Sequence, residues 1–204
     1  MKELIKLLYL VLKDLKIEIR RGFELSSLFL FVLLVSLLIS YSSYFVFKYV
    51  AIPSFFILVI FVAIFSSTTT FVREVDKNTL LGLKIAPIKP ATVFMSKSIF
   101  TFILVSINGL FASIFLTVFT RSFAPLEILP AFFVFAVYVS TVSSFSSALV
   151  MYSEGKSSLI PMLTFVFVFP IIPSLMNLNV QILALETALI FLAFTVLFDY
   201  LMEI

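Results

Sequence analysis

The sequence predicts an all-α protein that crosses a membrane several times, and two observations lead to that prediction. Of the 204 residues, 62% are hydrophobic and only 12% are charged, whereas a soluble domain is roughly half apolar and a quarter charged. The charges are separated by uncharged runs, each as long as the roughly 20 residues that cross a bilayer as a helix. We therefore expect one transmembrane domain over residues 1–204, helical because lipid cannot satisfy free backbone groups.

The first segment, residues 1–24, is charged and amphipathic, with a three-to-four spacing of apolar residues on one side and basic residues on the other. Its apolar positions are Leu4, Leu8, Val11, Leu12, Leu15, Ile19 and Phe23. We expect a helix that lies along the membrane surface. The alternative is a charged extension of the first span, but Gly22 offers a bend before Leu25 and favours the surface helix.

Six apolar runs follow, and each predicts a transmembrane helix. They cover residues 25–47, 50–71, 97–120, 127–151, 158–175 and 180–200. The sixth has the weakest signal, since it carries Glu186 near one end and Asp199 near the other. Pro170 and Pro173 are expected to break the fifth helix near its outer end, which would leave residues 174–179 as a short re-entrant or exposed element.

Lysine and arginine predict the orientation of these helices. Twelve of the 14 lie in the N-terminal segment, between the second and third spans or after the fourth span, while Lys48 and Arg121 lie on the opposite side. Loops rich in Lys and Arg stay in the cytoplasm. We expect both termini to be cytoplasmic, which agrees with an even number of spans.

The loop over residues 73–92 differs most from the rest of the chain. The stretch 71–97, "FVREVDKNTLLGLKIAPIKPATVFMSK", holds seven charged residues. Asn78 or Thr79 is suited to cap a short helix that Pro87 would close. Its apolar positions are Leu80, Leu81, Leu83 and Ile85. This helix would either lie on the membrane and anchor the spans or enter a groove of a soluble partner, and periodicity does not decide between the two.

Several kinds of chemistry are missing from the sequence. It has no His and no Cys, which excludes disulfides, zinc fingers and His-based acid–base catalysis. No glycine-rich phosphate-binding pattern is present, so we expect no ATP hydrolysis by this chain. Its carboxylates show no catalytic pairing, and its methionines are expected to be apolar filler rather than haem ligands. We expect a non-enzymatic protein with no catalytic residue, no metal site and no nucleic-acid partner.

Hydroxyl-bearing residues cluster in the second and fourth spans, and an amide lies within the third. The positions of interest are Ser66, Thr69, Asn108, Ser143 and Ser147. Small polar residues of this kind pack helices closely by bonding across their interface, or they line a polar pathway, and we favour packing. No Asp, Glu, Lys or Arg lies deep within the first five spans, which argues against an ion-coupled carrier.

Taken together, the basic segment "LKDLKIEIRR", the six spans, the charged loop and the "FPIIP" element resemble the haem exporter protein B (CcmB) family. These proteins are membrane subunits of ABC-2 type (type V) exporters in cytochrome c maturation. The resemblance covers nearly the whole chain. Within the loop, the family pattern falls on Phe71, Glu74, Thr79, Leu80, Pro87 and Lys97.

The resemblance implies that the loop is the coupling helix on which a separate, CcmA-like ABC ATPase acts. The implied contact residues are Arg73, Glu74, Asp76, Thr79, Leu80, Leu81 and Leu83. The implied function is that of a permease subunit for haem export or delivery in cytochrome c biogenesis, in a prokaryotic inner membrane. Expected partners are the ATPase, a second copy of this chain, CcmC-like proteins and membrane lipid.

ATP would bind the partner ATPase, no cofactor would bind this chain, and haem would be the transported or handled ligand. The residues leave open whether haem itself crosses or the complex only releases a haem-loaded chaperone, and the absence of His and Cys favours the second. Other functions also stay open: a permease for a lipid, glycan or drug, and an assembly subunit that transports nothing.

Overall fold

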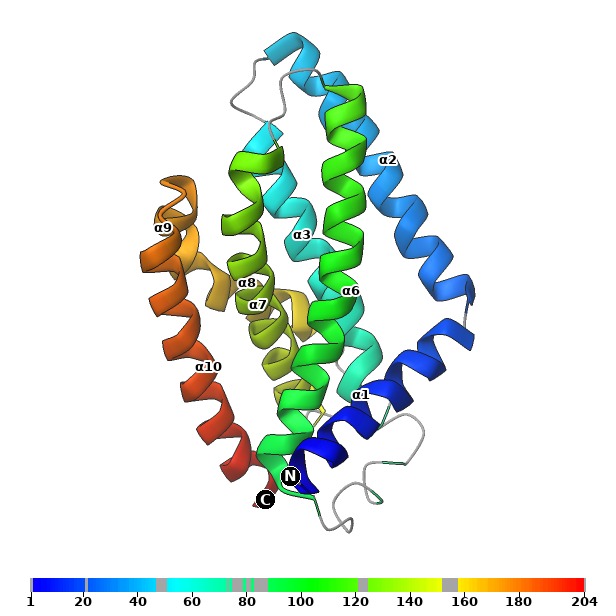
Figure 1. The fold of residues 1–204 in the computed structure, drawn as a ribbon, viewed down its shortest axis with the longest axis vertical. Coiled ribbons are helices and arrows are strands. Elements are labelled where there is room, and N and C mark those ends of the chain that lie inside the picture. The colour runs from blue at the N-terminus through cyan, green and yellow to red at the C-terminus, as the bar shows by residue number, and fades with distance from the viewer. Residues whose placement is uncertain are drawn as a thin grey trace.

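The computed structural model describes residues 2–20, 22–46, 51–72, 74, 79, 82, 88–120, 125–151 and 158–203. Within these ranges the regular elements are all helical and none is a strand, which confirms the all-α class (Figure 1). In chain order they are α1 (Lys2–Arg20), α2 (Gly22–Val46), α3 (Ala51–Ser67), the π-helical segment η1 (Thr68–Val72), α6 (Pro90–Phe119), α7 (Pro125–Val150), α8 (Leu159–Val168), the 3₁₀ turn η2 (Phe169–Ile171), α9 (Ile172–Met176) and α10 (Val180–Glu203).

Five helical segments are long and apolar enough to cross a membrane: α2, α6, α7, the run from α8 through α9, and α10. A sixth apolar helix, α3, has 17 residues and continues into η1. These features are those of a multi-pass membrane protein.

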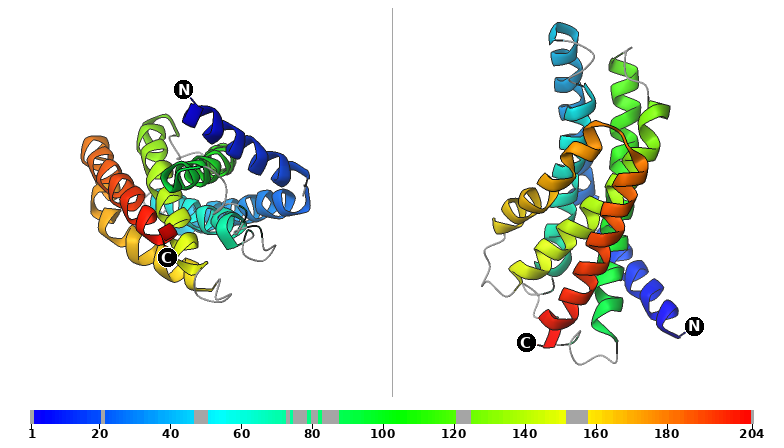
Figure 2. Two further views of the ribbon diagram at one scale, coloured as in Figure 1. Left: turned by 90° about the horizontal axis from the view of Figure 1, so that it is seen from below. Right: turned by 90° about the vertical axis from the view of Figure 1, so that its left-hand side faces the viewer.

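The helices α6 and α7 form the centre of the fold. Seen from below, α1 and α2 lie to one side of them and α8 and α10 to the other (Figure 2). Of the apolar stretch of α7, 72% is buried, against 17% of that of α2. Aromatic rings fill the core: Phe55, Phe56, Phe71, Phe94, Phe132, Phe135 and Phe198 are all fully buried. The outward surface of α2 is therefore available to lipid, whereas α7 is enclosed by protein.

The orientation of α1 explains its mixed sequence. Leu4, Leu8 and Leu12 are exposed, whereas Asp14 and Glu18 are buried. The apolar side thus faces out of the molecule, where lipid would be, and the acidic side faces α6. Helix α1 meets α2 at a sharp angle rather than continuing it (Figure 1), an arrangement that favours a separate surface helix over an extension of the first span.

The third predicted span begins earlier than expected. We predict its start at residue 97, but α6 begins at Pro90. Lys89 is extended, with φ −67° and ψ 140°, and proline suits the first position of a helix because the N–H it lacks would have no partner there. The last residues of the predicted loop therefore belong to α6.

The predicted break in the fifth helix is confirmed only in part: the α-helix α8 ends at Val168, just before Pro170, but the chain does not leave the helical path there. Pro170 lies in η2 and Pro173 in the first turn of α9, so the chain stays helical through both prolines. A 3₁₀ turn changes the hydrogen-bond pattern locally, so that a carbonyl left without the proline N–H can find another donor. Residues 174–176 belong to α9, and the reversal comes at residues 177–179, where Leu178 has a φ of 51°. This reversal lies short of the upper ends of α2 and α6 (Figure 2).

Candidate functional site

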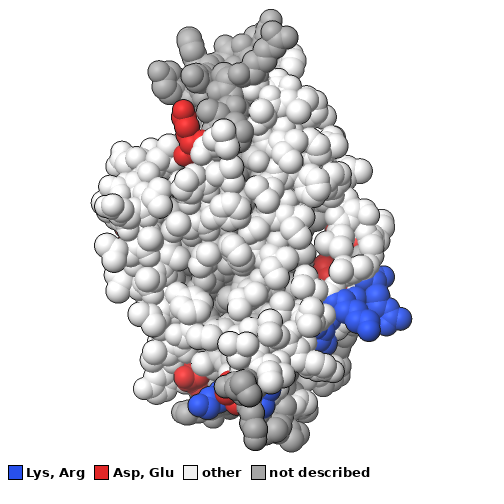
Figure 3. All heavy atoms as spheres, viewed as in Figure 1, with Lys and Arg blue, Asp and Glu red and all other residues white. Residues whose placement is uncertain are grey.

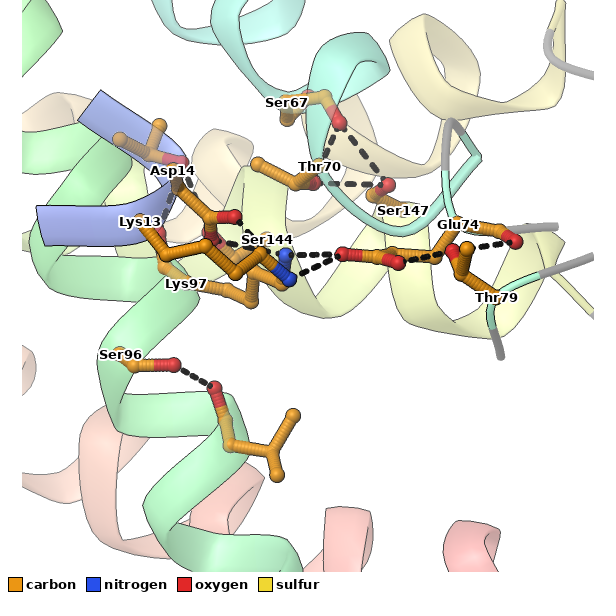
Figure 4. Close-up of polar contacts among 12 residues, drawn as sticks. Lys13, Asp14, Ser67, Thr70, Glu74, Thr79, Ser96, Lys97, Ser144 and Ser147 are labelled. Atoms are coloured by element: carbon orange, nitrogen blue, oxygen red, sulfur yellow. Dashed lines mark hydrogen bonds and ion pairs between the residues drawn. The ribbon is translucent and has the colours of Figure 1, made fainter. Parts of the chain in front are cut away.

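A buried group of charges lies where α1 crosses the base of α6 (Figure 4). At its centre is Lys97, in the second turn of α6, with only 3% of its surface exposed. Its Nζ lies 2.8 Å from Oδ2 of Asp14 on α1 and 3.1 Å from Oε1 of Glu74, just after η1. Asp14 and Glu74 are also buried, at 7% and 8% exposed. We call Lys97, Asp14, Glu74, Lys13 and Thr79 the Lys97 cluster.

Two more side chains complete the cluster. Nζ of Lys13 lies 3.2 Å from Oε1 of Glu74 and 3.7 Å from Oδ1 of Asp14. The Thr79 hydroxyl donates to the Glu74 carboxylate, and the Thr79 amide donates to the Glu74 carbonyl oxygen at 3.0 Å. Two positive charges thus meet two negative ones, which is the balance that buried ions require.

The local structure of each element explains how these residues meet. The early start of α6 at Pro90 adds the turns that carry Lys97 toward α1. A second contact, from the Thr92 hydroxyl to Oε2 of Glu3 at 3.2 Å, fixes the other end of α1 against α6. Phe71, at the end of η1, is buried with its ring centroid 5.9 Å from Nζ of Lys97. The cluster therefore joins α1, the start of the charged loop and α6.

The cluster also holds Glu74 in its ionised form. Burial by itself would raise the pKa of this carboxyl, but the charge of Lys97, the hydrogen bond from Thr79 and the charge of Lys13 outweigh it. The net effect lowers the pKa of Glu74 from 4.5 to about 2. At neutral pH Glu74 is therefore ionised and forms ion pairs with Lys97 and Lys13.

Above the cluster, hydroxyls connect η1 to α7 (Figure 4). Ser147 donates to the Ser67 carbonyl at 2.9 Å, and Thr70 donates to the Ser147 hydroxyl at 3.1 Å. Thr101 of α6 and Ser144 of α7 are 3.2 Å apart between their hydroxyl oxygens. These bonds tie three helical segments together without any charge.

The other predicted polar positions bond within their own helices. The Ser66 hydroxyl donates to the Val62 carbonyl, Ser143 to the Ser140 carbonyl, and the Asn108 amide to the Leu104 carbonyl at 2.9 Å. Of the Thr69 side chain nothing is described.

The structure brings together only two of the predicted partner-binding residues, Glu74 and Thr79. The others, Arg73, Asp76, Leu80, Leu81 and Leu83, lie outside the described residues.

Sequence reasoning missed Asp14 and Lys13, and it did not place Lys97 in the site. One signal was present: Asp14 and Glu18, four residues apart, put two acids on one side of a helix whose other charges are basic except for Glu3. A helix that contacted only lipid and water would not bury acidic side chains, so these acids indicate a contact with another part of the protein.

The side chains of the cluster are paired with one another, and the described residues hold no group of three side chains that could bind a metal ion. The cluster is an internal connection between helices that is made by ion pairs. Comparison of the chain with protein-family models, curated proteins and solved structures finds no match.

Proposed function

We propose that this chain is the membrane subunit of an ATP-driven complex, in which a partner ATPase acts on the loop over residues 73–92. The observation that carries this proposal is the Lys97 cluster, because it joins the loop at Glu74 to both α1 and α6. A force applied to the loop would reach both helices through buried ion pairs. Packed elements of this kind move as rigid bodies when an effector shifts one of them.

The π-helical segment η1 extends this connection. It lies between α3 and Glu74 and is attached to α7 by the bonds of Thr70 and Ser147. π-helical segments are rare in proteins, and those that occur are often located at functional sites. Displacement of the loop would therefore act on α3, α6 and α7 together.

The substrate and the partners in this proposal rest on the resemblance to the CcmB family. The complex would serve haem delivery in cytochrome c biogenesis, in a prokaryotic inner membrane, with ATP bound by a CcmA-like ATPase. Because an ATPase dimer offers two equivalent grooves, two copies of this chain would be present, beside CcmC-like proteins. A chain without His or Cys is suited to releasing a haem-loaded chaperone rather than to ligating haem tightly.

Two substitutions distinguish binding of the ATPase to the loop from transmission of its movement to the helices. Leu80→Asp places a charge on the apolar side expected to enter the ATPase groove, and it should reduce ATPase co-purification at least tenfold. Lys97→Gln weakens the cluster at a residue outside the expected contact set, so it should keep co-purification and reduce the ATP hydrolysis that depends on this chain. Lys89→Gln is the control, since Lys89 is exposed and outside the cluster. Full co-purification with correctly inserted Leu80→Asp would refute the proposal.

A further inference from the structure

Two adjoining cavities form a crevice beside the first turns of α2, and the smaller one also reaches Glu18 of α1. The larger cavity, about 560 Å³, lies between the first turns of α2 and the middle of α6. The lining residues are Leu25, Ser26, Phe29, Leu30, Leu33, Ile107, Asn108 and Phe111. This volume falls within the range of roughly 300–1,000 Å³ that ligand pockets in proteins occupy.

The lining of this cavity is apolar, and its two polar residues bond within their own helices. The Ser26 hydroxyl donates to the Gly22 carbonyl at 2.6 Å, and the Asn108 amide donates to the Leu104 carbonyl at 2.9 Å. A second cavity of about 370 Å³ adjoins it at Leu25 and is lined partly by Glu18 and Glu24. The larger cavity is therefore the one suited to a hydrocarbon chain.

Basic residues lie at the bend beside the crevice. Lys16 and Arg20, four residues apart in α1, are both exposed, and Arg20 belongs to the last turn of the helix. Basic side chains gather on this flank with acidic atoms just above them, and most of the surface beyond is uncharged (Figure 3). A basic group at the edge of an apolar membrane surface attracts anionic headgroups.

We propose that this crevice binds one anionic phospholipid from the leaflet that contacts α1. An acyl chain fills the larger cavity, and the phosphate lies against Lys16 and Arg20. The apolar side of α1 faces outward, which places the bend between α1 and α2 at the membrane interface. Anionic phospholipids are abundant there. The lipid would hold α1 at its angle to α2. This inference does not depend on an ATPase partner.

The test is retention of phosphatidylglycerol by the purified full chain, measured by native mass spectrometry against phosphatidylcholine of the same chain length. Ile107→Trp fills the cavity and should remove the retained lipid. Its matched control is Ile114→Trp, two turns further along α6, because Ile114 lies outside the lining and is similarly exposed, 55% against 48%. Leu30→Trp and Leu38→Trp form a second such pair on α2.

The headgroup is tested separately. Removing each positive charge with Lys16→Gln and Arg20→Gln should weaken retention about fivefold, whereas Lys89→Gln should have no effect. Equal retention of the two lipids would overturn the proposal. So would equal retention by Ile107→Trp and Ile114→Trp, or a disulfide between two chains carrying Ser26→Cys, which would show a second copy in the crevice.

Discussion

Lys97 is buried together with the carboxylates of Asp14 and Glu74, so each charge depends on the others for compensation. Removing one member of a buried ion pair leaves an uncompensated charge, which typically costs about 3–5 kcal/mol. Lys97→Met should therefore destabilise the protein by about that amount, whereas Lys89→Met, at an exposed position nearby, should have little effect. Unfolding by SDS in mixed micelles measures both. A loss below about 1 kcal/mol would mean that the cluster is solvated.

The lowered pKa of Glu74 predicts a pH dependence of stability. Because ionised Glu74 is favoured in the folded protein, its contribution is complete above pH 4.5 and is lost as the pH falls from 4.5 toward about 2. The unfolding temperature of the wild type should therefore fall more steeply between pH 5 and pH 3 than that of Glu74→Gln.

Glu127→Gln is the control for this comparison. Glu127 is exposed at the start of α7, and this variant should keep the slope of the wild type. Equal slopes for the wild type and Glu74→Gln would contradict the prediction.

Single residues also show why the Lys97 cluster was only partly predictable. Asp14 and Lys97 are 83 residues apart, and no local pattern in the sequence records their pairing. Glu74 and Thr79 were singled out as ATPase contacts implied by the family resemblance, and not as partners of Lys97. Asp14 lies on a helix with many charged residues, so its charge alone did not distinguish it from its neighbours.

Among the elements, the packing of α6 against α7 depends on a glycine. A Cβ added at Gly109 of α6 would overlap the ring of Phe132 on α7. That ring is 2% exposed, with the ring of Phe55 at a centroid distance of 5.5 Å, so it has little room to move. Gly109→Ala should therefore destabilise the protein by about 1–3 kcal/mol.

A smaller residue at position 132 tests the cause. Phe132→Leu removes the ring atoms that meet the new Cβ, so the double variant Gly109→Ala/Phe132→Leu should lose less stability than the two single losses together. Gly22→Ala is the control, because nothing lies within 4 Å of a Cβ at Gly22. Additive losses in the double variant would assign the effect of Gly109→Ala to another cause.

Helix positions were predictable because a membrane requires long uncharged runs, and each predicted run coincides with a helical segment. The start of α6 was misplaced for the same reason. Lys97 was taken as the boundary because it is charged, but its charge is neutralised inside the helix by Asp14 and Glu74. The prolines of the fifth span did not end the helical path, because Pro170 lies in a 3₁₀ turn and Pro173 in the first turn of α9.

At the scale of the whole molecule, the positive-inside pattern makes a prediction about topology. The chain contains no cysteine, so each introduced thiol is unique. Helix α6 begins at the lower end of the molecule and α7 at the upper end (Figure 1). Lys89→Cys and Glu127→Cys, both at exposed positions, therefore report on opposite sides of the membrane.

A membrane-impermeant maleimide should label Glu127→Cys in intact cells, and it should label Lys89→Cys only after the membrane is opened. Labelling of Lys89→Cys from outside would reverse the orientation, and with it the access of an ATPase to the loop.

The 83-residue separation between Asp14 and Lys97 also has a consequence for biogenesis. The ribosome releases the first helix long before it has made the lysine that neutralises this aspartate. Until then the acids of the nascent N-terminus must stay hydrated, and α1 cannot dock. Helix α1 would thus be fixed only after the third hydrophobic segment has entered the bilayer, although it is synthesised well before that segment.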